Sequence, residues 1–434
     1  MAHRLGQLSL ISGALPIVLL VAGVAAAAWL LVRRDRRHLV RTVPVLVLTA
    51  LVTSGAFAFV VERVWRPFPD ALPPSIYFWV GVGVGGLLLA VPRLRHGSGV
   101  CSRVVTVLAA VSVLLTASSR VNLFFKAFPT VATALGHAAG RQVDFATVPG
   151  PAATLITGSP VDRVWVAPSS MPATGAVSKV PIPGAVSGFA ARDAEVYLPP
   201  AYLSTPRARL PVLVLQAGQP GSPTDWVTIN GLAPMMDAYA ARHGGLAPVV
   251  IMPDATGSIL GNPLCLDSAL GNVATYLSVD VPNWVRAHLQ VSTDPVQWAI
   301  GGLSYGGTCS LQMAVNHAAV YPSFLDISGQ GEPTLGDRTK TVNAAFGGDA
   351  SRFVAVNPVD VMARDRFPDS HGVFVVGAQD DAYRPQAQKL FMVARAAGMH
   401  VQYHEVPGGH DFGVWRKGLE DNLEWLGTRL GLTA

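Results

Sequence analysis

The chain has 434 residues, half of them apolar, and its mean hydropathy is +0.38. Residues 1–135 carry 13 Lys and Arg against 3 Asp and Glu, whereas the remaining 299 residues carry 19 against 24. The basic excess therefore belongs to an apolar N-terminal part, and no basic stripe interleaved with aromatic residues appears, so we expect no nucleic-acid partner.

Four apolar runs occupy this N-terminal part. The first three, at about 8–32, 42–61 and 75–92, are long enough to cross a hydrocarbon core of about 30 Å. The fourth, at about 104–119, is shorter, with Arg103 and Arg120 placed to snorkel at its ends. The first run is too long for the apolar core of a signal peptide. The sequence therefore predicts a transmembrane domain of about four helices over residues 1–135.

The loops between these runs differ in charge. The third loop carries Arg93 and Arg95, and the second is balanced by Glu62 and Asp70. The first loop, "RRDRRHLVR", carries five arginines: Arg33, Arg34, Arg36, Arg37 and Arg41. Positively charged loops mark the cytoplasmic side. We therefore expect loops one and three inside the cell, and both termini and the rest of the chain outside the cytoplasm.

The remainder of the chain changes character twice. Residues 136–183 are rich in Ala, Gly, Pro, Ser and Val without sustained periodicity, which predicts a linker with one strand in "VDRVWVAP". From residue 184, buried-strand runs such as "LPVLVLQAG", "APVVIMPDATG" and "HGVFVVGAQDD" alternate with helical segments such as "LQMAVNHAAVYP". "GVWRKGLEDNLEWLGTRLG" predicts a final amphipathic helix. This alternation predicts, for residues 184–434, a mainly parallel sheet with helices on both faces.

The stretch "GGLSYGG" carries the chemistry. Gly302, Ser304 and Gly306 match G-x-S-x-G, in which a serine stands on a sharp turn between a strand and a helix. A strand pattern, "VQWAI", precedes the motif, and helical spacing in "TCSLQMAVNHAAV" follows it. The two glycines suit such a turn because side chains there would collide. The motif therefore predicts Ser304 as a nucleophile.

An acid and a base follow in chain order. Asp380 and Asp381 end the buried strand in "VFVVGAQDD", and His410 lies in the loop "PGGHDFGVW" after the last strand. His410 would take the proton from Ser304, and an aspartate would hold the imidazole tautomer. The G-x-x-D spacing from Gly377 favours Asp380 as that acid, and Asp381 is the alternative acid, which would otherwise cap the next segment.

An oxyanion hole requires two backbone donors. We expect the first to be the N–H of Tyr305, directly after the nucleophile. We expect the second to be Gln219, in the loop "LQAGQPGSPTDW" that follows an earlier strand, although a plain strand-to-helix turn would also account for that loop. Such a donor typically stabilises the transition state by about 2.7–4 kcal/mol.

The motifs "GGLSYGG", "GAQDDAY", "PGGHDFGVW" and "LQAGQPGSPTDW" resemble the putative-esterase family of α/β-hydrolases. That family includes feruloyl and S-formylglutathione esterases and mycobacterial mycolyltransferases. The whole chain resembles actinobacterial members with N-terminal membrane spans. The mycolyltransferases have a glutamate as triad acid and a basic residue beside the oxyanion loop, where this chain has an aspartate and Pro220. The resemblance therefore implies a membrane-anchored extracytoplasmic serine esterase. An envelope acyltransferase and a degenerate, membrane-tethered binding domain are the alternatives.

The cysteines and histidines bear on disulfides and cofactors. Cys265 and Cys309 are the only cysteines in the soluble part, and outside the cytoplasm we expect them to form a disulfide rather than two buried thiols. That bond would stabilise the fold by roughly 4 kcal/mol on the chain-entropy model. No Cys or His stands at metal-ligand spacing, so the sequence predicts no metal and no cofactor. The expected partners are an ester or a lipid or glycan acyl substrate, and membrane lipids.

Overall fold

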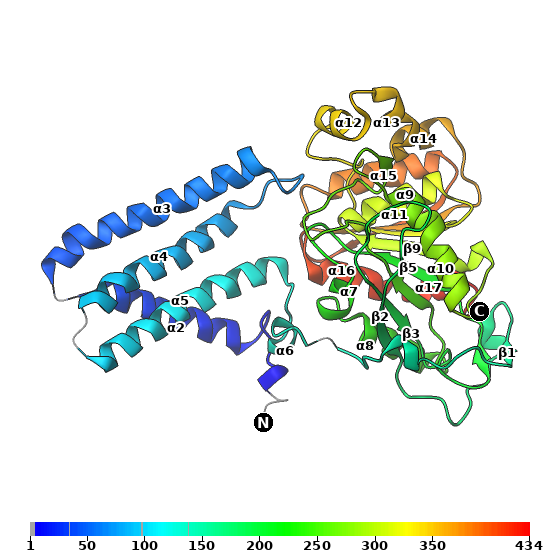
Figure 1. The fold of residues 1–434 in the computed structure, drawn as a ribbon, viewed down its shortest axis with the longest axis horizontal. Helices are drawn as coiled ribbons and strands as arrows, with labels where there is room; N and C mark the ends of the chain where they lie inside the picture. The colour runs from blue at the N-terminus through cyan, green and yellow to red at the C-terminus, as the bar shows by residue number, and fades with distance from the viewer. Residues whose placement is uncertain (1–4, 34, 97–98, 138) are drawn as a thin grey trace. The chain divides into compact units, whose positions relative to one another are not determined.

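The computed structural model describes residues 5–33, 35–96, 99–137 and 139–434, so Arg34 lies outside the described residues. The chain divides into two compact units, Met1–Gly136 and His137–Ala434. The first unit is helical and the second is built around a β-sheet (Figure 1).

Among the described residues of the first unit, four helices are long and apolar enough to cross a membrane. They are α2 (Ala14–Leu31), α3 (Val43–Phe59), α4 (Pro74–His96) and α5 (Val100–Phe125), and π-helical turns at His38–Thr42 (η1) and Val60–Trp65 (η2) extend α3 at both ends. Helix α5 packs against α2 and α4, and α4 packs against α3. Small residues permit this packing, because a methyl group on Gly23 would overlap Thr116 and one on Gly86 would lie 2.6 Å from Val113.

Helix α5 is longer than the apolar run that predicted it. Inside the helix, the hydroxyls of Thr106, Ser112 and Thr116 donate to carbonyls one turn earlier, so these polar side chains are satisfied within α5 itself. At 26 residues the helix has the length of a full span. All four apolar runs therefore correspond to helices of spanning length.

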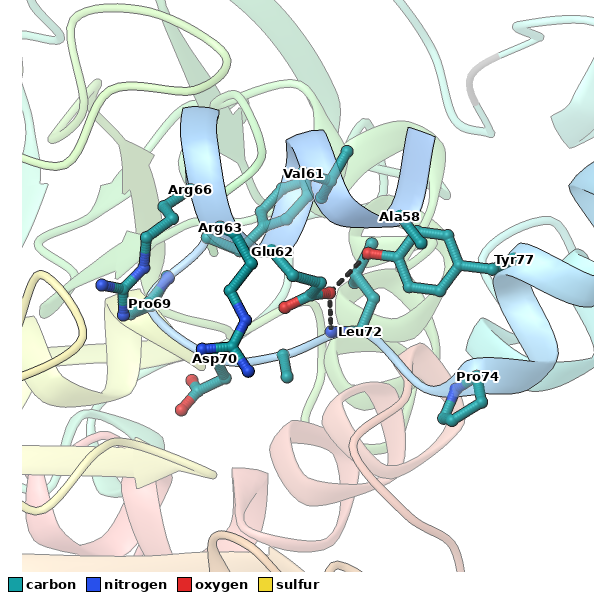
Figure 2. A pocket seen from close by; sticks show the side chains of 12 residues that line it. Ala58, Val61, Glu62, Arg63, Arg66, Pro69, Asp70, Leu72, Pro74 and Tyr77 are labelled. Carbon is teal, nitrogen blue, oxygen red and sulfur yellow. Dashed lines mark hydrogen bonds between the residues drawn. The ribbon is translucent and has the colours of Figure 1, made fainter. Parts of the chain in front are cut away.

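The loop between η2 and α4 folds back on the helix ends and, with them, lines an open pocket of about 590 Å³ (Figure 2). The Glu62 carboxylate accepts hydrogen bonds from the Tyr77 hydroxyl and from the Leu72 amide, the latter at 2.9 Å. These two bonds join the loop and the start of α4 to Glu62 of η2.

The second unit contains an eight-stranded sheet. Its strand order is β12-β11-β10-β9-β5-β6-β3-β2, and all pairs are parallel except β6–β3 and β3–β2. The strands are β2 (Ala176–Val180), β3 (Ala194–Leu198), β5 (Val212–Gln216), β6 (Val249–Met252), β9 (Trp298–Leu303), β10 (Ser323–Ile327), β11 (His371–Gly377) and β12 (His400–Val406). The central strands are buried along their whole length, as their continuous apolar runs predict.

Helices cover both faces of this sheet, which confirms the predicted α/β fold (Figure 1). Helix α11 packs against β9 and β10, α15 against β11 and β12, and α16 against β10 and β11. The longer helices are α8 (Leu232–Arg242), α10 (Val281–His288), α11 (Tyr305–Asn316), α12 (Arg338–Phe346), α15 (Arg384–Ala396) and α16 (Phe412–Asp421). The seven-residue helices are α13 (Ala350–Val356), α14 (Pro358–Arg364) and α17 (Leu423–Arg429), and the shortest are α7 (Asp225–Thr228) and α9 (Val273–Thr275).

Two local predictions were wrong. "VDRVWVAP" is a 3₁₀ turn over Val161–Arg163 (η4) and not a strand, because the amides of Val161 and Asp162 bond to the C-terminal carbonyls of Gly431 and Leu432. The single C-terminal helix is two helices, α16 and α17, which meet at Asn422, where the side-chain amide donates to the Gly418 carbonyl. In both places a tertiary or side-chain hydrogen bond replaces the regular backbone pattern.

Candidate active site

Ser304 stands on a strained turn between β9 and α11. Its backbone has φ 53° and ψ −116°, a region that non-glycine residues rarely occupy. Its amide donates to the Ile327 carbonyl at 2.8 Å, which anchors the turn to β10. A methyl group on Gly302 would overlap Gly306, and one on Gly306 would overlap the Gln216 carbonyl. The two glycines of G-x-S-x-G are therefore sterically required here.

A chain of hydrogen bonds joins Ser304, His410 and Asp380. The distance from His410 Nε2 to Ser304 Oγ is 2.9 Å, and the distance from His410 Nδ1 to Asp380 Oδ2 is also 2.9 Å. The three residues follow β9, β11 and β12, whose carboxyl ends meet at one edge of the sheet. Ser304 is 9% exposed and Asp380 4%, whereas the His410 side chain is 26% exposed. The arrangement suits proton transfer from Ser304 to His410.

The structure separates the two aspartates. Asp380 Oδ1 accepts from the Tyr383 amide at 3.1 Å while Oδ2 faces His410, so both carboxylate oxygens are engaged. Asp381 is exposed on the surface. Consecutive residues in this turn point in different directions, and only Asp380 contacts the histidine.

Two aromatic rings hold His410 in place. The Tyr383 ring stacks on the imidazole with centroids 4.0 Å apart, and the Trp415 ring meets it edge-on at 4.9 Å. A methyl group on Gly377 would overlap the carbonyls of Gly408 and Gly409, so this glycine allows the histidine loop to lie against the end of β11. Both aromatics stand within the motifs "GAQDDAY" and "PGGHDFGVW", but residue spacing alone does not reveal the stacking.

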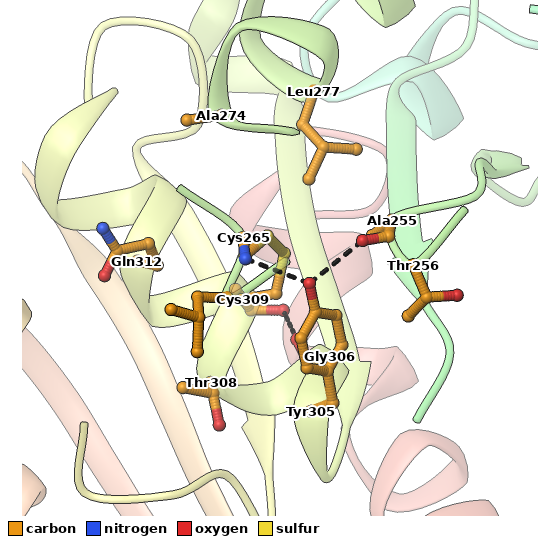
Figure 3. Close-up of a disulfide and its surroundings, with 12 residues drawn as sticks. Ala255, Thr256, Cys265, Ala274, Leu277, Tyr305, Gly306, Thr308, Cys309 and Gln312 are labelled. Carbon is orange, nitrogen blue, oxygen red and sulfur yellow. Dashed lines mark hydrogen bonds between the residues drawn. A yellow bond between two sulfur atoms is a disulfide. The ribbon is translucent and has the colours of Figure 1, made fainter. Parts of the chain in front are cut away.

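The two predicted oxyanion residues flank Ser304. Tyr305 is the first residue of α11, so its N–H is an orphan donor of the helix N-terminus. Its phenol is buried, which raises its pKa, and it accepts from the Cys265 amide and donates to the Ala255 carbonyl, each at 3.0 Å (Figure 3). Its hydroxyl therefore serves structure, which leaves the backbone N–H for chemistry.

The loop that holds Gln219 lies against the nucleophile. A methyl group on Gly218 would stand 2.7 Å from the Leu303 side chain and 3.6 Å from Ser304 Cβ. Gln219 directs its side-chain amide away, to the Leu260 carbonyl at 3.0 Å. The backbone at Gly218, directly before Gln219, therefore adjoins Ser304.

The cysteines form the expected bond. Cys265 and Cys309 are linked by a disulfide across 44 residues, with Cα atoms 5.3 Å apart (Figure 3). Cys309 lies in α11 one turn after Ser304, and its side chain is fully buried. The disulfide therefore ties the loop that ends at Cys265 to the helix behind the serine. Cys101 is free and exposed.

Sequence reasoning gave no role to an ion pair beside this site. Arg192 binds both carboxylate oxygens of the buried Asp254 at 2.8–2.9 Å, and its Nη2 also donates to the Gly221 carbonyl at 3.0 Å. Gly221 belongs to the same loop as Gln219. Arg192 precedes β3 and Asp254 follows β6, so their partnership depends on the antiparallel β3–β6 pair, which no local motif encodes.

The fold defines the second unit as an α/β-hydrolase domain, and comparisons with known proteins give the family of the chain. The family model described as "Esterase: Putative esterase" matches residues 190–426. An uncharacterized protein of Corynebacterium glutamicum is 37% identical over 432 residues, which cover 97% of each chain. The chain belongs to the putative-esterase family, and this membership places it among the carboxylic-ester hydrolases.

A solved structure of low sequence identity shows the same fold. A ferulic acid esterase is 18% identical with a TM-score of 0.51, and the match covers 59% of this chain and 98% of that one. The fluorophosphonate-binding serine hydrolase F of Staphylococcus aureus is also 18% identical, with a TM-score of 0.47 and coverage of 58% and 98%.

Proposed function

We propose that the chain is a membrane-anchored serine esterase whose catalytic domain faces the outside of the cytoplasm. The continuous hydrogen-bond chain from Ser304 through His410 to Asp380 carries this proposal. The four apolar helices support the membrane anchor. The arginine-rich first and third loops and the disulfide between Cys265 and Cys309 support the extracytoplasmic placement.

The reaction proceeds in two steps. His410 Nε2 takes the proton of Ser304 as Oγ attacks the ester carbonyl, and Asp380 stabilises the imidazolium that forms. The N–H groups of Tyr305 and Gln219 donate to the oxyanion. His410 then protonates the departing alcohol, which leaves an acyl-enzyme on Ser304. In the second step His410 activates water, which releases the acid.

The same acyl-enzyme could pass its acyl group to an alcohol instead of to water. Four helices of spanning length hold the catalytic domain at a membrane, where lipid and glycan hydroxyls are concentrated. An acceptor alcohol that replaces water in the second step turns hydrolysis into acyl transfer. Supplying a sugar alcohol with the ester and separating acylated sugar from free acid distinguishes the two outcomes.

Replacing Ser304 tests the proposal directly. Ser304→Ala removes the nucleophile, so p-nitrophenyl ester turnover and covalent labelling by a fluorophosphonate should both disappear. Ser310→Ala is the matched control, because this buried hydroxyl lies on the same helix and donates only to the Gly306 carbonyl, at 2.7 Å.

Undiminished labelling of Ser304→Ala would contradict the assignment. A wild-type chain that forms no covalent adduct would instead favour the degenerate, membrane-tethered binding domain.

A further inference from the structure

The loop Ala255–Cys265 is closed at its base by the residue that follows the nucleophile. The Tyr305 hydroxyl bridges the two ends of the loop, since it accepts from the Cys265 amide and donates to the Ala255 carbonyl (Figure 3). The disulfide to Cys309 fixes the same end a second time. Leu264 and Cys265 have φ of 66° and 57°, which are left-handed conformations that persist only under such constraint. Both ends of the loop are thus fixed to α11.

The tip of this loop is joined to the loop that holds Gln219. The Gly221 amide donates to the Ile259 carbonyl at 3.0 Å, and Gln219 Nε2 donates to the Leu260 carbonyl at 3.0 Å. Gly218, in the same loop, adjoins Ser304. The backbone of Ile259 and Leu260 is therefore hydrogen-bonded to the loop whose Gly218 lies against Ser304.

The side chains at this tip are apolar and exposed. Ile259 is 64% exposed and Leu260 39%, although their backbone is fixed by hydrogen bonds on one side and by the anchored loop base on the other. These two neighbouring apolar side chains are exposed to water on an ordered loop. A ligand that covers them therefore binds more tightly, because burying apolar surface lowers the free energy of the complex.

The sheet order indicates which part of an ester lies there. His410 and Asp380 follow β12 and β11, on one side of β9, whereas the loops with Gly218 and Ile259 follow β5 and β6, on the other side. The leaving oxygen must face His410, because His410 protonates it. The carbonyl oxygen faces the N–H groups of Tyr305 and Gln219, so the third substituent, the acyl group, points away from His410, to the side of β9 on which the β5 and β6 loops lie.

We propose that Ile259 and Leu260 determine acyl specificity by covering the apolar chain of the substrate's acyl group. This inference rests on the proposed esterase function. It predicts that the wild-type chain prefers p-nitrophenyl octanoate to p-nitrophenyl acetate, measured as the ratio of the two kcat/KM values.

The test uses the full chain in detergent. Ile259→Ala and Leu260→Ala should each lower the octanoate-to-acetate ratio about tenfold, because each removes apolar surface from the acyl contact. Leu260→Met, which conserves volume, should restore most of the ratio. Val296→Ala is the control: Val296 is 47% exposed and precedes β9, at the opposite edge of the sheet from Ser304, so its ratio should equal that of the wild type.

Fluorophosphonate labelling separates the two hypotheses. If wild-type Ser304 is labelled but the wild type shows no preference for octanoate, or the alanine variants keep the wild-type ratio, the acyl-specificity inference is overturned and the esterase proposal stands. If wild-type Ser304 is not labelled, the esterase proposal itself fails and the inference fails with it.

Discussion

At the scale of single residues, Asp380 and Asp381 show how adjacent identical side chains take different environments. Asp380 is 4% exposed and bonds to His410 and to the Tyr383 amide, whereas Asp381 faces solvent. The turn that follows β11 imposes this difference, because the Asp380 amide bonds to the Gly377 carbonyl at 3.0 Å and fixes where the carboxylate points.

This geometry predicts opposite outcomes for two matched substitutions. Asp380→Asn should lower kcat for a p-nitrophenyl ester by about 10⁴, because an amide favours the wrong imidazole tautomer. Asp381→Asn should keep wild-type kcat, and melting temperatures should show that both variants fold. A comparable loss of activity in Asp381→Asn would show that the acid is assigned to the wrong residue.

Asp326 is a second residue whose environment sets its chemistry. It lies on β10 and is 2% exposed; its Oδ1 accepts from the Gly329 amide at 2.8 Å, and its Oδ2 has no hydrogen-bond partner among the described residues. Burial raises the pKa of this carboxyl from 3.8 to about 7, although the Gly329 hydrogen bond lowers it. Below pH about 7 the neutral form is therefore favoured in the folded state.

This raised pKa predicts that stability falls with increasing pH. Between pH 3.8 and about 7 the folded chain holds a proton that the unfolded chain has released, so Asp326 contributes stability below pH 3.8 that is lost as pH rises through about 7. The full loss is about 4 kcal/mol. Asp326→Asn should therefore flatten the pH dependence of stability. Unfolding midpoints of the wild type and the variant, in detergent at pH 5 and 8.5, measure this. Parallel pH curves for the two chains would refute the prediction.

At the scale of elements, the site is assembled from loops that the sheet brings together. The guanidinium of Arg192, which precedes β3, binds the Asp254 carboxylate after β6 and the Gly221 carbonyl after β5. Burial tends to raise the pKa of Asp254, but hydrogen bonds from Arg192 and Thr256 outweigh burial and hold this pKa below its ordinary value. The ion pair therefore fixes the loop of Gln219 to its neighbours.

Breaking this ion pair should be costly. Arg192→Ala leaves the Asp254 carboxylate buried without its partner, so we expect a loss of about 3–5 kcal/mol in unfolding free energy. Arg242→Ala is the control, because Arg242 pairs with Glu424 at the surface, where both side chains are more than half exposed, and should cost about 0–1 kcal/mol. Urea unfolding in detergent measures both. Equal losses in the two variants would show that Arg192 acts as an ordinary surface charge.

At the scale of the whole molecule, the chain combines a helical unit of membrane-spanning composition with a hydrolase unit. The charge of the loops predicts that loops one and three are cytoplasmic, which places the start of α5 inside the cell. Cys101 stands at that start, and it is a free, exposed thiol. The protein therefore carries a natural reporter of its own orientation.

Thiol labelling of intact cells tests this orientation. A membrane-impermeant maleimide should not label Cys101 in intact cells but should label it after permeabilisation. Ser351→Cys adds an exposed thiol to the hydrolase unit at α13 and should be labelled without permeabilisation. Labelling of Cys101 from outside would mean that the orientation is reversed.

The sequence by itself determined the elements and the order of the chemical groups. Hydrophobic runs and periodicity record the burial of neighbouring residues, so they located the four apolar helices, the buried strands and the strand–serine–helix turn at Ser304. The motifs also named His410 and Asp380, because each follows a recognisable strand. The same local reasoning failed at Val161–Arg163, where a bond to the chain's C-terminal residues replaces a strand.

Only the tertiary structure decided which distant groups meet. The stacking of Tyr383 on His410, the pairing of Arg192 with Asp254 and the bridge from Tyr305 to both ends of the Ala255–Cys265 loop each join residues from separate strands or loops. Their proximity follows from the spatial order of the strands, which differs from their order in the chain. Local sequence patterns do not predict that spatial order, because it results from how the whole sheet buries its two faces.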